Sequence, residues 1–138
     1  MGKRLFNDVA YDIKSQLSHL VVRNENLIDN IAWTPQNLLL VSLPGMKSSQ
    51  SFEFDPRSNQ RVNMLSLNAS HPTPSPDGKW IAGFSAVNAK SNAAASNDRQ
   101  ISLSLFPYKG GKPTLVDHIA NPDMITLLWS PDALICIE

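Results

Sequence analysis

The runs that decide the fold of this chain are three corners in its sequence: Trp33-Thr34-Pro35, Ser75-Pro76-Asp77-Gly78 and Trp129-Ser130-Pro131-Asp132. Each corner ends an apolar stretch with a hydroxyl residue that is followed by proline. The corner prolines lie 41 and then 55 residues apart. A recurrence on this scale is typical of proteins built from repeated supersecondary units, so we expect a repeat architecture.

The second corner has the composition of a tight hairpin turn. Proline presets φ for the first central position, aspartate suits the second, and glycine accepts a positive φ at the exit. Three other segments between apolar runs have comparable turn chemistry and are also expected to be hairpin turns. They cover residues 12–17, 55–60 and 108–113.

The rest of the sequence favours short β-strands. Apolar runs rich in Val, Ile, Leu and Phe alternate with clusters of Asn, Ser, Pro and Gly, and ten prolines leave little room for long helices. From Gln16 to about Val21 a helix is an alternative, because the apolar residues there come near helical spacing. We expect strands at Val9–Ile13, Ser18–Val22, Ile28–Trp33, Leu38–Leu43, Ser51–Phe54, Arg61–Leu65, near Leu67–Pro74, and at Trp80–Ala86, Gln100–Phe106, Thr114–Asp117, Ile125–Trp129 and Ala133–Ile137.

At its corners the chain resembles the repeat of TolB-type β-propellers, whose blades carry a Trp/Phe-Ser-Pro-Asp-Gly-Lys-x-Ile/Leu-Ala run between their first two strands. The second corner, Ser75-Pro76-Asp77-Gly78-Lys79-Trp80-Ile81-Ala82, matches this run almost throughout. The third lacks the glycine and the lysine, and the first lacks the aspartate and the glycine. The first corner spacing also matches the roughly 40–45 residues of one blade. The resemblance implies an all-β fold of four-stranded antiparallel blades.

This resemblance divides the single domain, residues 1–138, into an outer half-blade (1–26), two blades (27–66 and 67–119) and an inner half-blade (120–138). Together these make roughly three blade-equivalents, whereas propellers typically close with 4–8 blades. We therefore expect completion by another chain, with a homodimer that closes a six-bladed ring as the leading solution and a hetero-complex as an alternative. A further alternative is that the chain is a piece of a longer propeller.

Composition excludes some classes of partner. Twelve basic and twelve acidic side chains cancel, and only 17% of the 138 residues are charged, so nothing favours nucleic acid or anionic lipid. No apolar run approaches the roughly 18 residues of a membrane span, and no signal peptide is evident. These features predict a cytoplasmic protein, or a periplasmic one if a leader was removed. The single cysteine, Cys136, is expected to be a buried core residue.

A search for chemistry yields no reaction centre. The three histidines, His19, His71 and His118, are spread at roughly one per repeat and form no metal-binding motif. There is no Gly-x-Ser-x-Gly elbow and no phosphate-binding loop. We therefore expect no metal, no cofactor and no catalytic residues. The aromatic residues of the strands are expected to pack in the core: Phe52, Phe54, Phe84, Phe106 and Tyr108.

The repeated corner residues are expected to be structural. Trp33 and Trp129 are predicted to pack between blades, and burial of Trp33 would make its truncation to alanine cost about 3–5 kcal/mol. The full structural set is Trp33, Pro35, Pro76, Asp77, Gly78, Trp129, Pro131 and Asp132.

The segment 87–99 is predicted to be an extended loop, and its insertion explains the longer second spacing. Irregular insertions on a rigid scaffold often carry recognition. Besides the corner turns, we therefore expect binding residues in this loop: Asn88, Lys90, Asn92, Asn97, Asp98 and Arg99.

The function that these features favour is a non-catalytic scaffold for protein–protein interaction, as the resemblance to TolB-type propellers implies. One alternative is the propeller portion of a peptidase of the prolyl oligopeptidase kind, whose catalytic domain would lie on another chain. Another is a structural subunit of a larger assembly that docks by strand addition.

Overall fold

The computed structural model of the chain describes residues 6–12, 16–24, 29–43, 50–86, 100–120, 126–132 and 134–137. Within these ranges every regular element is a β-strand, and no helix there is long and apolar enough to cross a membrane. The strands are β1 (Phe6–Asp12), β2 (Leu17–Asn24), β3 (Asn30–Trp33), β4 (Leu39–Leu43), β5 (Gln50–Asp55), β6 (Gln60–Leu65), β7 (Ser70–Pro74), β8 (Trp80–Ala86), β9 (Gln100–Pro107), β10 (Thr114–Ala120), β11 (Thr126–Trp129) and β12 (Leu134–Ile137).

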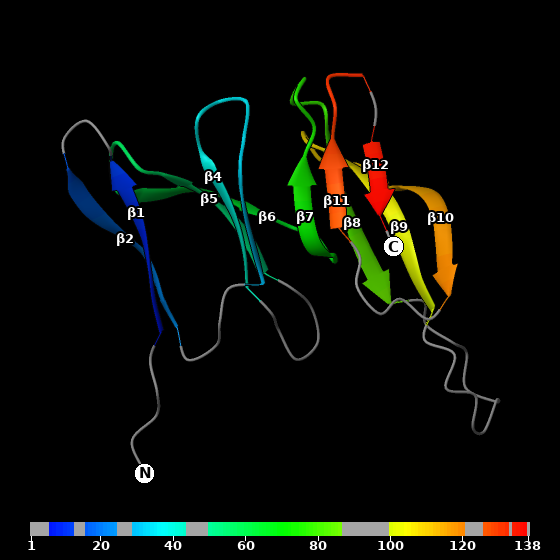
Figure 1. Cartoon of the computed structure of the whole chain (residues 1–138), viewed down its shortest axis with the longest axis horizontal. Helices are drawn as coiled ribbons and strands as arrows, with labels where there is room; N and C mark the ends of the chain where they lie inside the picture. The colour runs from blue at the N-terminus through cyan, green and yellow to red at the C-terminus, as the bar shows by residue number, and fades with distance from the viewer. Residues whose placement is uncertain are drawn as a thin grey trace, which may run out of the picture.

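The strands form two complete sheets flanked by two half-sheets (Figure 1). The complete sheets have the orders β3-β4-β5-β6 and β7-β8-β9-β10, and the half-sheets are the hairpins β1-β2 and β11-β12. Every pairing is antiparallel and joins strands that are consecutive in the chain. The predicted all-β fold of four-stranded antiparallel sheets is confirmed.

The first strands of successive sheets lie side by side. β7 contacts β3 and β4 of the first complete sheet and also β11. In Figure 1 the hairpin β1-β2 lies at the left, beyond the first complete sheet, and the hairpin β11-β12 lies over the second complete sheet. Below we call β3, β7 and β11 the inner strands. An arrangement in which four-stranded sheets meet along their inner strands is that of propeller blades.

The core fills the spaces between neighbouring sheets. Strand alternation gives the first complete sheet two apolar faces. One face carries a cluster of Leu39, Val41, Leu43, Phe52 and Phe54, all buried. The other face packs against the second sheet through Leu40, Leu67 and Ile81. Burial of each large side chain of this kind stabilises the fold by about 1.5–3 kcal/mol.

A third apolar cluster joins the second complete sheet to β11. Leu127 of β11 is buried with Ala82, Phe84, Leu103 and Ile119, and Trp129 packs against this cluster. The expectation that strand aromatics form the core is confirmed for Phe52, Phe54 and Phe84, which are at most 5% exposed.

Gly83 on β8 allows β7 to approach closely. A Cβ atom at this position would lie 2.8 Å from the Cβ of Ala69 and 3.3 Å from the main-chain oxygen of Ser70. The pairing of β7 with β8 also shifts between Ser70 and Thr73, where His71 adopts a positive φ of 51°. β7 is therefore an irregular strand.

The predicted strands agree with the structure apart from their ends. The segment for which a helix was the alternative is part of β2. It lies after a turn in which Gln16 has a positive φ of 57°, and Asn59 in the turn between β5 and β6 has the same value. Local turn chemistry therefore outweighs the weak helical spacing of Leu17, Leu20 and Val21.

Candidate interaction site

The Ser75 corner, between β7 and β8, is held by a closed set of hydrogen bonds. The hydroxyl of Ser75 donates to Asp77 Oδ1 (2.6 Å) and accepts from the backbone N–H of Trp80 (3.0 Å). Asp77 Oδ1 also accepts from the N–H of Lys79 (3.0 Å). The Ser75 hydroxyl and then the Lys79 amide hold the pKa of Asp77 below its ordinary value. Gly78 takes a positive φ of 69° and closes the turn.

The corner between β3 and β4 repeats this geometry with different residues. The Thr34 hydroxyl accepts from the N–H of Leu38 (3.2 Å), and the N–H of Asn37 donates to the carbonyl of Thr34 (3.0 Å). Asn37 has φ of 60°, so asparagine fills the place that glycine takes in the second corner. Gln36 takes the place of Asp77 in this corner. Its exposed amide does not hold the turn as the carboxylate of Asp77 does.

In the third corner, between β11 and β12, the described residues end at Asp132. Its N–H donates to the hydroxyl of Ser130 (3.4 Å), and both Pro131 and Asp132 are exposed. All three corners therefore place a hydroxyl residue before proline at the same point, with the polar tip of the turn in solvent. Of the residues expected to be structural, the prolines, Asp77, Gly78 and Asp132 lie in these turns, and Trp33 and Trp129 end the strands before them.

These turns lie together on one end of the sheets. β5 runs back to the first corner, because Phe54 pairs with Leu39, and β9 runs back to the second, because Pro107 pairs with Trp80. The backbone N–H of Tyr108 donates to the carbonyl of Lys79 (2.9 Å). We call this surface the corner face; it consists of residues 34–38, 55–60, 75–79, 107–113 and 130–132.

Neighbouring corners on this face are in contact. A Cβ atom placed on Gly78 would lie 2.9 Å from Nε2 of Gln36 and 3.6 Å from Cγ of Pro35. The first two corners are therefore parts of one continuous surface. Because each corner is fixed by its own hydrogen bonds, the backbones of the two turns are held in fixed relative positions.

Two ion pairs hold four of the charged side chains of the corner face. Lys79 Nζ lies 3.4 Å from Asp77 Oδ2, and Arg57 Nε lies 3.3 Å from Asp55 Oδ1. Hydrogen bonding from the Arg57 backbone and its positive charge lower the pKa of Asp55. Exposed pairs of this kind contribute little to stability. They leave the corner face polar without a strong net charge. Such a face suits binding to a polar protein surface better than binding to a polyanion.

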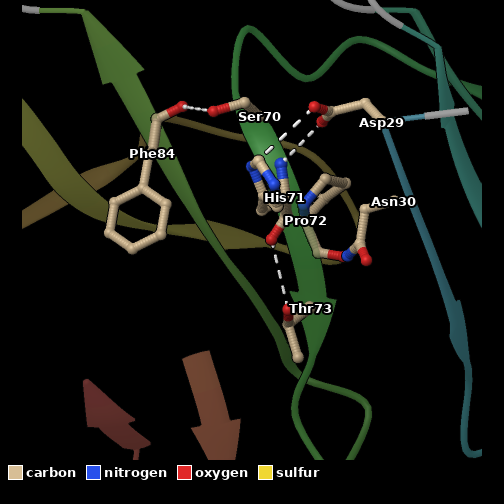
Figure 2. Close-up of polar contacts among 7 residues, drawn as sticks. All are labelled: Asp29, Asn30, Ser70, His71, Pro72, Thr73 and Phe84. Carbon is tan, nitrogen blue, oxygen red and sulfur yellow. Dashed lines mark hydrogen bonds and ion pairs between the residues drawn. The ribbon is translucent and has the colours of Figure 1, made fainter. Parts of the chain in front are cut away.

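The blades are joined on their inner side by a polar seam. Asp29 Oδ2 accepts from the backbone N–H of His71 (2.9 Å), and Asn30 Nδ2 donates to the carbonyl of Pro72 (2.9 Å). Figure 2 shows Asp29 and Asn30 reaching across to β7. Oδ1 of Asp29 also lies 3.8 Å from Nδ1 of His71. These contacts join residues 42 apart, close to one repeat.

The same seam continues to β11 through Trp129. Its indole Nε1 donates to the carbonyl of Thr73, 2.9 Å away. Trp129 therefore packs between blades, as the sequence predicted. Trp33, at the equivalent place on β3, does not: it is 62% exposed. The prediction that Trp33 is buried is wrong for the described chain. β3 is the first inner strand in the described ranges, and within them no inner strand lies beside Trp33 as β7 lies beside Trp129.

The loop residues predicted to bind a partner, Asn88, Lys90, Asn92, Asn97, Asp98 and Arg99, lie outside the described residues. The strand ends that flank them are described. Ala86 pairs with Ile101, at the end of β8 away from the corner. The loop and the corner turns therefore start from opposite ends of the second sheet.

Sequence reasoning missed a buried polar contact between the two complete sheets. Glu53 on β5 is 4% exposed, and its carboxylate accepts hydrogen bonds from the hydroxyl of Tyr108 and from Nδ2 of Asn63 (2.5 Å). Burial and the negative charge of Glu53 raise the pKa of Tyr108, so the phenol stays protonated and keeps donating. This contact joins the second sheet to the first at the corner face, to which Tyr108 belongs.

One serine and histidine pair has the composition, but not the geometry, of a catalytic pair. Ser102 Oγ lies 3.2 Å from Nδ1 of His118 across β9 and β10. The neighbouring carboxylate of Asp117 accepts from the backbone N–H of His118 (2.7 Å) rather than from its ring. A triad needs the acid to orient the imidazole. In the ranges that the structure covers, no group of three or more His, Cys, Asp or Glu residues is placed to hold a metal ion.

The paired sheets, the inner strands and the repeated corners together define a β-propeller-type fold. Comparison with solved structures identifies the kind of propeller: the chain is similar to TolB from Acinetobacter baumannii, with a TM-score of 0.67 and 17% sequence identity over 91% of this chain. The chain spans about 30% of the length of that TolB chain. It therefore has a TolB-like propeller fold. No family model and no curated protein matches the sequence, and at this identity the likeness shows the fold alone.

Proposed function

We propose that this protein is a non-catalytic scaffold that binds another protein through its corner face. The observation that carries the proposal is the continuity of that face: the turns at Pro35, Gln36 and Gly78 touch one another, and each is locked by its own hydrogen bonds. A rigid surface of this kind binds with little loss of conformational entropy. The TolB-like fold supports the proposal by providing the platform.

The chemistry of the corner face suggests what it would recognise. Its exposed groups are amides, prolines and charges of both signs, among them Gln36, Asn37, Asp77 and Lys79. Such groups make hydrogen bonds to a folded, polar protein surface. The loop residues 87–99 remain part of the proposal as a second recognition element. Among the described residues no carboxylate accepts a hydrogen bond from the ring of His118 in the Ser102–His118 pair, which is why we prefer the scaffold to the peptidase alternative.

The cellular compartment of the protein is also part of the proposal. The likeness to TolB lends no support to the cytoplasmic location that composition predicted, and it is compatible with the periplasmic alternative. Fractionation of cells that carry a tagged full-length protein decides between the two.

The corner face can be tested by site-specific photo-cross-linking in cells. A photoreactive amino acid placed at Gln36 or Lys79 should capture a discrete protein, while the same amino acid at Arg61, which is exposed on β6 outside the corner face, should not. The captured protein is then purified and titrated against the wild type and the Lys79→Glu variant. We expect Lys79→Glu to weaken binding at least about tenfold, as loss of one interface charge pair does.

Two results would refute this function. One is equal capture from Gln36, Lys79 and Arg61, which would mean that the corner face has no preference. The other is turnover of peptide substrates by the purified protein that is lost in a Ser102→Ala variant.

A further inference from the structure

The turn between β9 and β10 carries the excess positive charge of the corner face. It contains Lys109 and Lys112, both exposed. The other basic side chains of this face, Arg57 and Lys79, each pair with an aspartate. In the described ranges neither Lys109 nor Lys112 lies within ion-pair distance of a carboxylate, and the remaining acidic residue of the face, Asp132, belongs to the third corner. Two ammonium groups at one turn are therefore left without a counter-charge in the described part of the protein.

The backbone of the same turn presents hydrogen-bond donors to solvent. Gly110 and Gly111 have positive φ values of 87° and 132°, and a Cβ atom on Gly110 would meet nothing within 4 Å. The N–H of Gly110 closes the turn by donating to the carbonyl of Pro107 (3.0 Å). The N–H groups of Gly111 and Lys112 have no acceptor among the residues that the structure describes. Two amide donors therefore follow a glycine that has open space around it.

Contacts with both complete sheets hold this turn in place. The N–H of Tyr108 donates to the carbonyl of Lys79 (2.9 Å), and its phenol donates to the buried carboxylate of Glu53 on β5. Pro107, at the start of the turn, pairs with Trp80 on β8. The backbone donors are thus positioned before any ligand arrives, which reduces the conformational entropy that binding costs.

This combination of groups suits carboxylates. Ammonium groups and free amide N–H groups both donate to carboxylate oxygens, and hydrogen bonds to a charged acceptor are stronger than those between neutral groups. A nucleic acid fits less well, because its affinity comes from the neutralisation of many phosphates, and this turn offers only two cations. Acidic side chains of a protein match the number and the kind of donors better.

We propose that the turn 109–112 binds carboxylate groups of the partner protein, so that an acidic segment of that partner docks on the second complete sheet. This inference rests on the proposed function, whose site it shares, and it adds the chemistry of the partner. At the first complete sheet the charge of Arg57 is already balanced by Asp55, and there we expect the partner to present uncharged polar groups.

An acidic peptide tests the turn without the natural partner. The full chain, isotopically labelled, is titrated at low salt with a short blocked peptide of alternating Glu and Asp, and amide chemical shifts are followed by NMR. The shifts should saturate, centre on Gly110, Gly111 and Lys112, and diminish as salt is added. A peptide of alternating Gln and Asn, which has the same length without the charge, should cause no shifts.

Two variants show which charges hold the peptide. Lys109→Gln/Lys112→Gln removes both ammonium groups and should weaken binding of the acidic peptide at least about tenfold. Arg57→Gln is the matched control, because it removes one cation from the same face, in the turn between β5 and β6, where Asp55 already pairs with it. It should bind the peptide as the wild type does. The dispersion of the amide signals verifies that each variant is folded.

The inference is overturned if the acidic peptide causes no saturable shifts at the turn, or if Arg57→Gln weakens binding as much as the double lysine variant. Tighter binding of a single-stranded oligothymidylate than of the acidic peptide would also overturn it, in favour of a nucleic acid. Protein capture from Gln36 and Lys79 without peptide binding would refute the inference and leave the proposed function intact. Peptide binding at the turn with equal capture from Gln36, Lys79 and Arg61 would refute the proposed function and leave a carboxylate-binding turn.

Discussion

The indole nitrogen of Trp129 donates a hydrogen bond to the main-chain oxygen of Thr73, 2.9 Å away, and so joins two inner strands that are separated by more than a full repeat. The ring of Trp129 also packs on the apolar cluster around Phe84 and Leu103. One side chain thus provides both the apolar and the polar part of the contact between the second sheet and the half-sheet that follows it.

The two parts can be separated by substitution. Trp129→Phe keeps an aromatic ring in the cluster but removes the donor to Thr73, and we expect it to lower the free energy of unfolding by about 0.5–1.5 kcal/mol. Trp129→Ala removes both parts and should cost more. Urea unfolding measures both, with Trp80→Phe as a control because no indole hydrogen bond of Trp80 is found in the described part of the chain. Equal stability of Trp129→Phe and the wild type would show that the bond contributes nothing.

The buried contact between Glu53 and Tyr108 predicts a specific dependence on pH. Burial and then the hydrogen bond and charge of Glu53 raise the pKa of the Tyr108 phenol above its ordinary value of 10.0. Above about pH 10 the unfolded chain therefore binds fewer protons at this group than the folded chain, so the stability that it contributes is present below pH 10 and is lost as the pH rises. Unfolding in urea should become progressively easier from about pH 10 upward.

Tyr108→Phe should remove that part of the alkaline decline. At neutral pH the variant should be less stable than the wild type by about 1–3 kcal/mol, because it takes a donor away from the buried carboxylate of Glu53. Above pH 10 its stability should fall less steeply than that of the wild type. Profiles that run parallel throughout this range would mean that Tyr108 does not titrate as part of the fold.

The strands and corners were predictable from sequence because both depend on local chemistry. Alternation of apolar and polar residues defines a strand within a few positions, and Pro76, Asp77 and Gly78 define a turn by themselves. The contacts between sheets were not predictable in this way. Asp29 reaches His71 and Glu53 reaches Tyr108 only because separate sheets stack in one particular register.

Trp33 illustrates the same limit for a residue within a motif. Its sequence context, Trp33-Thr34-Pro35, resembles Trp129-Ser130-Pro131, and the motif alone predicts the same burial for both. Burial depends on whether an inner strand lies beside the tryptophan, and for Trp33 none does within the described ranges. For the candidate site, sequence located the turns but could not show that Gln36 and Gly78 meet on one surface.

The geometry of the Ser75 corner predicts how Asp77 titrates. The Ser75 hydroxyl is the largest cause of the lowered pKa of Asp77, followed by the Lys79 amide. Ser75→Ala should therefore raise the pKa of Asp77 toward its ordinary value of 3.8, as followed by carboxyl chemical shifts in an NMR titration. Because a lowered pKa stabilises the folded state only above that ordinary value, the variant should also lose less stability than the wild type on acidification. Asp55, held by Arg57, is the internal control and should not change.

Ser42 and Ser51 lie directly opposite each other on β4 and β5, and both are fully buried. Within the part of the chain that the structure describes, neither hydroxyl has a hydrogen-bond partner. A buried hydroxyl without a partner loses its hydrogen bonds to water and gains none within the protein. Ser42→Ala and Ser51→Ala should therefore each raise the free energy of unfolding by about 1 kcal/mol. Ser70→Ala is the contrasting case and should lower it, because the Ser70 hydroxyl donates to the carbonyl of Phe84 (3.3 Å). The Ser42→Ala/Ser51→Ala double variant completes a thermodynamic cycle. Additive gains in the free energy of unfolding would confirm two independent unsatisfied hydroxyls. Two destabilised single variants and a neutral double variant would show instead that the two serines hydrogen-bond to each other in solution.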